Sequence, residues 1–538
     1  MTPPPLISVI TPVYRPKLAH LRACLDSVLS QDMSDWELVL VDDASGDPAV
    51  TELLRSYAGN PRAILHTRSE NGGIVAASND GLRIARGQLV ALLDHDDVLE
   101  PEALAAVKQH FERNPSAEVI YSDRGHIDDS GKKITPDFLK PDWSPEWLRS
   151  NMYLAHLTVV SRTAAIEVGG FRADYEGAQD HDLVLRITER GRPAVHIPRV
   201  LYQWRATAGS TAQNADAKPY AREAGLRAVR DHCRRMGIRA EIKQGPRPGS
   251  YALSRTPDPG TKVSVIIPTR GTREVIFGEE RCLVVSAVQS VTGVGYTADY
   301  ELLVVFDTNA DTGYLDDVVE AGRGRVRLVP FDGPFNFSRK VNLGALHATG
   351  DVLLLLNDDV QVISENWLDH IAALAQEPDV AAAGLKLLYE GGLVQHAGIG
   401  VKPPRGVFNA NARKPVTGGY FGTPLIDHEA LGTTAACMAV RKQVYFELGG
   451  FSEELPESYN DVDFCFKALA AGYRNVVANS VQMYHFESMS RDPVATVAER
   501  AEIWGRWRRL FEADPYLRSQ SRPAKPSAAR KSPASSRK

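Results

Sequence analysis

The chain has 538 residues, of which 43% are hydrophobic and 24% are charged, and its formal net charge is −5. This length suggests two to four domains of a soluble globular protein, and the modest charge gives no reason to expect nucleic acid as a partner. The cysteines are scattered without CxxC spacing, which is typical of reduced cytoplasmic thiols and argues against a disulfide framework or a zinc site. We see no signal peptide and no apolar run near the ~20 residues that span a bilayer.

Short apolar runs alternate with amphipathic stretches from the start of the chain. "LISVIT", "ELVLV" and "LVALL" are nearly continuous runs of Val, Ile and Leu, a pattern typical of strands buried on both faces of a parallel sheet. Between the first two, "LAHLRACLDSVLSQ" carries apolar residues at helical spacing. We therefore predict an α/β, Rossmann-like fold with a mostly parallel sheet flanked by helices.

Acidic residues follow two of these strands. Asp42 and Asp43 end one run, and Asp94, Asp96 and Asp97 end another. Ligands of such sheets bind beyond the carboxyl ends of the strands, so these acids should converge on one crevice. A hard divalent cation, Mg²⁺ or Mn²⁺, would relieve their mutual repulsion. The alternative, capping of the helix predicted in "EPEALAAVKQHF", needs only one Asp.

The second part of the chain repeats these motifs in the same order. "ISVITPVYRP" is echoed by "VSVIIPTRGT", "SNDGLRIARGQLVALLDHDD" by "VNLGALHATGDVLLLLNDDV", and "GGFRADYEGAQDHDL" by "GGFSEELPESYNDVDFC". We predict two tandem domains of one fold, residues 1–242 and 263–515. A Pro- and Gly-rich linker, residues 243–262, would join them. Residues 516–538 are basic and rich in Ser and Pro, which predicts a disordered tail. That tail is either solvated or in weak contact with an anionic membrane face.

No GxGxxG follows the first strand and no GxxxxGK[ST] occurs, which argues against a dinucleotide oxidoreductase or a P-loop NTPase. The motifs "SVITPVY", "VDDAS", "DHDD", "QDHDL" and "LYQWR", followed by "SVIIPTR", "LLNDDV", "NDVDFC" and "YHFES", instead resemble two copies of an inverting family 2 glycosyltransferase with the GT-A fold. The second set resembles transferases that build bacterial O-antigens and related cell-surface polysaccharides, rhamnosyltransferases among them.

The resemblance implies roles for individual residues. Asp180 and Asp461 would be the general bases that deprotonate the acceptor hydroxyl, which requires a carboxylate within ~3 Å of it. The residues implied to bind the nucleotide-sugar are Pro12, Asp42, Asp43, Asn79, Asp94 and Arg205 in the first half, and Pro268, Asp307, Asn342 and Asp358 in the second. The implied metal-binding residues are Asp94, Asp96, Asp358, Asp359 and His485. The metal would act as a Lewis acid for the nucleotide leaving group.

The two halves depart from the family pattern in different ways. Gln179 and Asn460 stand where the family usually has Glu before the base. Asp182 and Asp463 could compete for the base role, but at i+2 on a helix they should point elsewhere. The second half has Phe306 in place of Asp42 and Asn357 in place of Asp94, and the first has Trp204 in place of His485. It therefore stays open whether one half is a non-catalytic partner.

Three aromatic residues precede the first base region: Trp143, Trp147 and Tyr153. Their rings suit an acceptor sugar and suit core packing equally well. We expect a cytoplasmic enzyme, in peripheral contact with the inner membrane, that transfers sugars to a lipid-linked glycan. The rivals are a sugar nucleotidyltransferase, which normally has a Gly-rich basic loop that "ITPVYRPKLAH" lacks, a glycan-binding scaffold, and a processive synthase, which usually has membrane helices.

Overall fold

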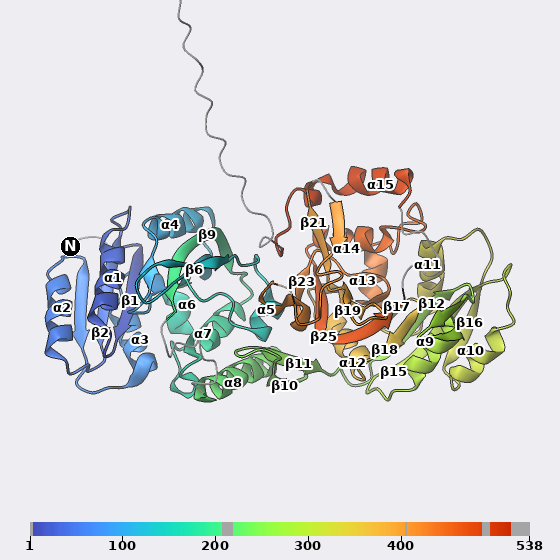
Figure 1. Ribbon diagram of the computed structural model, residues 1–538, viewed down its shortest axis with the longest axis horizontal. Helices are drawn as coiled ribbons and strands as arrows, with labels where there is room; N and C mark the ends of the chain where they lie inside the picture. The colour runs from blue at the N-terminus through green and yellow to red at the C-terminus, as the bar shows by residue number, and fades with distance from the viewer. Residues whose placement is uncertain (1–3, 207–218, 404–405, 419, 487–494, 518–538) are drawn as a thin grey trace, which may run out of the picture.

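The computed structural model describes residues 4–206, 219–403, 406–418, 420–486 and 495–517. The predicted disordered tail lies almost wholly outside these residues. Two α/β lobes lie side by side along the long axis of the molecule, with the hairpin β10–β11 between them (Figure 1). The tandem α/β fold expected from the repeat is thereby confirmed. The exact domain boundaries stay a prediction.

The first lobe is built on one mixed sheet with the strand order β3-β2-β1-β4-β8-β6-β9-β5, and β7 pairs with β6. Its strands are β1 (Ile7–Val13), β2 (Trp36–Asp42), β3 (Ala63–Thr67), β4 (Leu89–Leu92), β5 (Val98–Leu99), β6 (Val119–Ile127), β7 (Lys133–Phe138), β8 (Thr158–Ser161) and β9 (Val195–Arg205). Its helices are α1 (Leu18–Leu29), α2 (Pro48–Ala58), α3 (Gly73–Ile84), α4 (Ala103–Arg113), α5 (Pro145–Ser150), α6 (Arg162–Glu167), η1 (Ala173–Tyr175), α7 (Gln179–Thr188) and α8 (Pro219–Arg235).

The hairpin β10 (Ala240–Gln244) and β11 (Tyr251–Arg255) occupies much of the segment predicted as a linker. The strands of the second lobe are β12 (Lys262–Thr269), β13 (Arg273–Ile276), β14 (Glu279–Cys282), β15 (Asp299–Asp307), β16 (Val326–Phe331), β17 (Val352–Leu356), β18 (Val360–Val362), β19 (Val380–Leu388), β20 (Val394–His396), β21 (Ile399–Lys402), β22 (Gly406–Asn409), β23 (His428–Ala430), β24 (Cys437–Arg441) and β25 (Arg474–His485). Its helices are α9 (Leu283–Thr292), α10 (Leu315–Ala321), α11 (Phe337–His347), α12 (Trp367–Gln376), η2 (Tyr420–Leu425), α13 (Lys442–Glu447), α14 (Asn460–Ala470), α15 (Val497–Trp507) and η3 (Arg508–Phe511).

The second sheet repeats the first strand for strand. Its order is β16-β15-β12-β17-β24-β19-β25-β18, with β20 added on β19 and β23 on β25. In both sheets the four strands that begin this order are parallel, as predicted, while the strands after them are mixed. Helices pack on both faces of each sheet, so every lobe has two apolar cores separated by a layer of strands.

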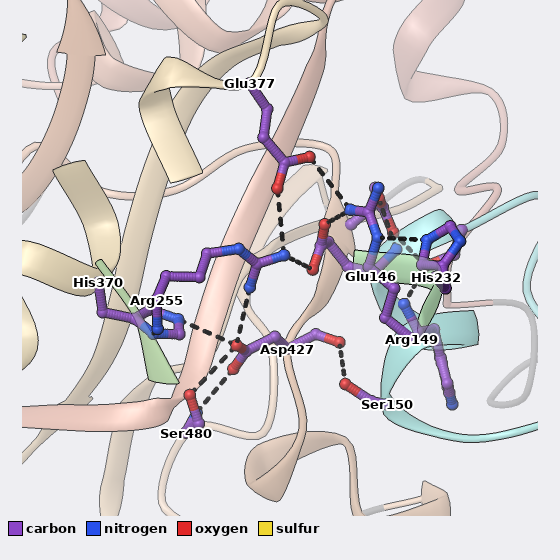
Figure 2. A network of polar contacts seen from close by, with 12 residues as sticks. Glu146, Arg149, Ser150, His232, Arg255, His370, Glu377, Asp427 and Ser480 are labelled. Carbon is purple, nitrogen blue, oxygen red and sulfur yellow. Dashed lines mark hydrogen bonds and ion pairs between the residues drawn. The ribbon is translucent and has the colours of Figure 1, made fainter. Parts of the chain in front are cut away.

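The lobes meet across a buried network of ion pairs (Figure 2). Arg255, at the end of β11, places its Nη2 2.7 Å from Glu146 of the first lobe and 3.1 Å from Glu377 of the second. Arg149 of α5 also reaches Glu377, at 3.1 Å, and Arg474 of β25 does so at 2.7 Å. Because unpaired charges are costly to bury, this network fits only a permanent contact between the lobes.

All five cysteines are free and buried, in agreement with the prediction that they form no disulfide framework. No helix within the described ranges is both long enough and apolar enough to cross a bilayer.

Candidate active sites

The predicted acids of both halves lie where parallel strands end. Strand β2 ends at Asp42 and β15 at Asp307, while "DHDD" follows β4 and "NDD" follows β17. In each sheet a single strand, β1 or β12, separates the two strands that carry these acids. Each half therefore has an acidic edge at the carboxyl end of its sheet, the position at which α/β folds bind ligands.

In the first half, the two acids after β2 shape the loop around them. Asp43 accepts hydrogen bonds from the backbone N–H groups of Gly72 and Gly73, both at 2.9 Å, and pairs with Arg68 at 2.9 Å. Asp42 accepts a hydrogen bond from the Ser45 N–H at 3.1 Å. Both carboxylates are buried. They hold the start of α3 and the end of β2 in place at the edge of the crevice.

The acids after β4 divide into two kinds. Asp97 is buried and accepts hydrogen bonds from the Tyr202 hydroxyl at 2.5 Å and the Arg205 N–H at 2.7 Å. Asp94 keeps 43% of its side chain exposed, and its Oδ2 lies 3.8 Å from His156 Nε2. Asp97 therefore anchors the turn, whereas Asp94 and Asp96 are the partly accessible acids of this motif.

In the second half the corresponding acids are more enclosed. Asp358 accepts a hydrogen bond from the Thr269 hydroxyl at 2.7 Å, and burial, together with the charge of Asp359, raises its pKa to about 6. Asp359 Oδ1 lies 3.1 Å from His485 Nε2. Burial alone would favour the neutral form of Asp359, but His485 outweighs it and lowers the pKa of this carboxyl.

The donor atoms of the second half suit a divalent cation. His485 Nδ1 lies 2.6 Å from Gln395 Oε1, an acceptor, so Nδ1 carries a proton, and Nε2 is the ring nitrogen that lies 3.1 Å from Asp359 Oδ1. The buried Oδ1 of Asn357 has no hydrogen-bond partner within the described part of the chain. Metal-binding histidines commonly donate their other ring N–H to an acceptor, which here is Gln395 Oε1. No three His, Cys, Asp or Glu side chains converge on one metal position among the described residues, and Mg²⁺ typically needs only one or two carboxylates besides water and phosphate.

The candidate bases lie in the first turns of two equivalent helices. Asp180 belongs to α7 and Asp461 to α14, and burial raises the pKa of both carboxyls. Asp461 accepts hydrogen bonds from the Ala435 N–H at 3.1 Å and the Val462 N–H at 2.8 Å. These N–H groups and the helix N-terminus favour the ionised form and partly offset burial.

The competing acids, Asp182 and Asp463, are fully buried. Asp182 pairs with Arg172 and Arg186, and Asp463 with Lys467 and Arg506. Their oxygens are therefore committed to the core of each lobe. This supports the choice of the first acid of each pair as the base.

Several residues predicted to bind the nucleotide-sugar have other partners in the structure. Asn79 exchanges two hydrogen bonds with the backbone of Phe171, and Asn342 does the same with Phe451. Each amide fastens a helix to the turn before the base, and a nucleotide-binding role for it stays a prediction. Pro12 and Pro268 lie within β1 and β12, in the interior of each sheet.

Arg205 also has partners within its own lobe. It is 3% exposed, and its guanidinium donates to the backbone carbonyls of Asp96 at 2.6 Å and Asp128 at 3.0 Å. These contacts stabilise the turn of the acidic motif, and a role of Arg205 in diphosphate binding stays a prediction.

The aromatic acceptor candidates are mostly core residues. Trp147 is 3% exposed and Tyr153 is 1% exposed. The Trp147 ring packs against Tyr153 and against His428 of the second lobe. Trp143 is only partly buried. Core packing, the alternative considered for all three, thus describes Trp147 and Tyr153.

The sequence did not single out two groups that face the sites. Lys340 is buried, and its Nζ lies 2.8 Å from Asp307 and donates to the Thr269 carbonyl at 2.7 Å. His156 lies beside Asp94 in the first half. Comparison of the repeats could have revealed both, because Ala77 stands opposite Lys340 and Ala436 opposite His156.

Comparison with known proteins agrees with this geometry. Residues 8–172 and 264–448 both match the family described as "Glycosyl transferase family 2". The two segments cover more than half of the chain and include the acidic edge of each sheet. The chain belongs to this family.

Two long relatives match almost the whole chain. "Uncharacterized protein y4gI" of Sinorhizobium fredii is 39% identical over 95% of this chain and 57% of its own length. "O-antigen biosynthesis protein RfbC" of Myxococcus xanthus is 36% identical over 93% of this chain and 38% of its own length. The chain thus spans only 57% and 38% of these relatives. Among solved structures, Staphylococcus aureus TarS 1-349 in complex with UDP-GlcNAc is 18% identical over 42% of this chain and 66% of that one, with a TM-score of 0.36.

Proposed function

We propose that the chain transfers a sugar, with inversion, from a nucleotide-diphosphate sugar to a growing glycan in the synthesis of a cell-surface polysaccharide. The observation that carries this proposal is the repeated placement of an acidic strand end, Asp94 to Asp96 or Asn357 to Asp359, near a carboxylate in the first turn of a helix. The similarity to a protein named for O-antigen biosynthesis supports the choice of product. The similarity of 198 residues to the "Chondroitin synthase" of Escherichia coli, at 33% identity, supports it further.

In the proposed mechanism the acceptor hydroxyl gives its proton to Asp461 in the second half and to Asp180 in the first. Burial raises the pKa of both carboxyls, which strengthens them as bases while their N–H donors keep an ionised fraction available. The hydroxyl oxygen then attacks the anomeric carbon from the face opposite the leaving nucleotide, which inverts the configuration. A transition state of oxocarbenium character is expected for this single displacement.

The acids at the strand ends would hold the diphosphate end of the donor. Asp94 and Asp96 in the first half, and Asp359 with His485 in the second, are the residues that would hold a divalent cation, Mg²⁺ or Mn²⁺. When bound, such a cation supplies Lewis-acid stabilisation of the departing nucleoside diphosphate. The acceptor in this proposal is a lipid-linked glycan, and the protein works in the cytoplasm in peripheral contact with the inner membrane.

The test uses Asp461→Asn and Asp180→Asn in the full chain, alone and together, with a panel of nucleotide-sugars and glycan acceptors. Each variant should keep binding of UDP, GDP or dTDP in the presence of Mn²⁺. Each should also lose the transfer that its own half performs, by ~10²–10⁴-fold, the usual contribution of a general base. Calorimetry measures the binding, and product analysis measures the transfer.

The same experiment decides whether one half is a non-catalytic glycan-binding partner. In that case one of the two single variants transfers sugar at the wild-type rate, while the other loses all transfer. Wild-type transfer by the double variant would contradict both base assignments.

A further inference from the structure

In the first half, the segment of residues 154–156 lies between the acidic motif and the candidate base. His156 Nε2 is 3.8 Å from Asp94 Oδ2. The Asp180 carboxylate is close enough to influence the His156 imidazole electrostatically, as Asp94 influences Asp180. The His156 side chain therefore faces the space that separates the diphosphate end of the site from its proton acceptor.

The second half has an equivalent segment in the same place. The Ala436 carbonyl accepts a hydrogen bond from the Asn357 N–H at 3.1 Å, and the Ala435 N–H donates to Asp461 at 3.1 Å. Strand pairing aligns the two segments, because Leu89 pairs with Ser161 and its repeat counterpart Val352 pairs with Arg441. The offset of 441 − 161 = 280 puts Ala436 opposite His156, since 436 − 156 is also 280. One site thus has an imidazole where the other has a methyl group.

The backbone around His156 is held in position by two basic side chains. Lys140 Nζ donates to the carbonyls of Leu154 at 2.8 Å and His156 at 3.0 Å, and Arg124 donates to the Ala155 carbonyl at 2.8 Å. Lys140 is fully buried. The imidazole is therefore presented on a fixed segment, which is the condition for a side chain that selects a ligand.

The ring presents its Nε2 nitrogen toward the site. Nδ1 of His156 is buried and has no hydrogen-bond partner within the described part of the chain, whereas Nε2 faces the Asp94 carboxylate. A ring nitrogen in the position of Nε2 can exchange a hydrogen bond with a substrate hydroxyl beside Asp94.

We propose that His156 contacts a hydroxyl of the transferred sugar in the first half, and that the two halves consequently prefer different donor sugars. This inference rests on the proposed function. In an in-line displacement the transferred ring lies between the leaving diphosphate and the base, which is the space that His156 faces. A site that hydrogen-bonds a substrate hydroxyl discriminates against sugars that lack it, and the methyl group of Ala436 cannot do so.

The experiment measures donor preference in the full chain with the second half silenced by Asp461→Asn. In this background, kcat/KM is determined for a panel of UDP-, GDP- and dTDP-sugars with the original His156, with His156→Ala and with His156→Gln. His110→Gln, on the outer helix α4, is the matched control. Calorimetry with UDP, GDP and dTDP in the presence of Mn²⁺ reports nucleotide binding without the sugar.

The proposal predicts that His156→Ala lowers kcat/KM for the preferred donor by ~10-fold or more, the usual effect of one lost hydrogen bond. The variant should also flatten the ranking of the sugars while nucleotide binding stays within about twofold. His156→Gln, which keeps a polar atom in this place, should recover part of the discrimination. Circular dichroism and thermal melting identify a variant that is misfolded. If His156→Ala is misfolded, the donor preference of His156→Gln tests the proposal.

Two outcomes overturn the inference. An unchanged sugar ranking and rate in both variants, with active first-half transfer, removes the role of His156 but leaves the proposed function intact. If the wild-type chain consumes no nucleotide-sugar of the panel, the proposed function fails and the inference fails with it.

Discussion

Asp182 shows how one residue of an acidic pair can serve the fold while its neighbour remains available for chemistry. It stands two positions after Asp180, but its carboxylate is fully buried between Arg172 and Arg186. Removing one partner of a buried ion pair leaves the other charge without compensation. A substitution of this carboxylate should therefore change the stability of the protein and not its rate of sugar transfer.

We expect Asp182→Asn to lower the free energy of unfolding by about 3–5 kcal/mol, the usual cost of breaking a buried ion pair. Urea denaturation followed by circular dichroism measures this loss. The exposed Asp332→Asn serves as the control and should stay within about 0.5 kcal/mol of the wild type. A loss as small as that of the control would mean that the ion pairs of Asp182 with Arg172 and Arg186 contribute little to stability.

At this scale the sequence predicted which acids stand at strand ends, because a residue that directly follows an apolar strand must lie at the edge of the sheet. It did not predict what the other polar residues contact. Asn79 and Asn342 recur in both halves and looked like ligand contacts, but each binds the backbone of a Phe 92 or 109 positions away. No local pattern encodes a partner at that separation.

At the scale of elements, helices α3 and α11 lie unusually close to strands β1 and β12 of their sheets. A Cβ on Gly344 of α11 would meet Ile266 Cγ2 at 2.4 Å, and a Cβ on Gly81 of α3 would meet Ile10 Cγ2 at 2.5 Å. Both contacts are with branched side chains on buried strands, which cannot move aside. These glycines set the distance between helix and sheet beneath each acidic edge.

Gly344→Ala should therefore destabilise the protein, although alanine is the better helix former. The overpacking costs about 1–3 kcal/mol and outweighs a helix-propensity gain of about 1 kcal/mol. Thermal denaturation should show a lower Tm, and Gly295→Ala, where the added Cβ meets open space, is the control. A higher Tm for Gly344→Ala would show that α11 is free to move away from β12.

The sequence predicted the elements of the parallel part of each sheet well, because their apolar runs are continuous. The antiparallel strands β8 and β24 were not predicted individually. They follow irregular loops and are short, and pairing with β4 and β17 decides their strand structure. Contacts with neighbouring strands, which the sequence of one strand does not show, thus determine the antiparallel part of each sheet.

At the scale of the whole molecule, the ion network of Figure 2 couples the stability of the halves to pH. Burial alone would raise the pKa of Glu146, but Arg149, Arg255 and Arg474 outweigh it and lower the pKa to about 2. A carboxyl with a lowered folded-state pKa contributes stability above its unfolded pKa, near 4.5, and loses this contribution as the pH falls toward 2.

Glu146→Gln should accordingly cost about 3 kcal/mol at pH 7, the usual order for removing one partner of a buried ion pair. The difference between wild type and variant should shrink as the pH falls from 4.5 toward 2. Urea denaturation at a series of pH values measures this, with the exposed Glu52→Gln as control. A difference that is constant with pH would show that Glu146 is not held ionised by the three arginines.

The sequence could not have predicted this contact between the halves. Glu146, Arg255 and Glu377 are separated by 109 and 122 positions, and each looks like an ordinary charged residue of a surface helix or linker. Only the packing of the lobes brings them together, and the segment expected to be a loose linker contributes the central arginine.

The burial of α5 against the second lobe bears on how the chain could be shortened. A deletion of the second lobe would leave Arg149 and Glu146 exposed on the surface of the first lobe. Water would solvate both charges there, so their ion pair would contribute little to the stability of the isolated first lobe.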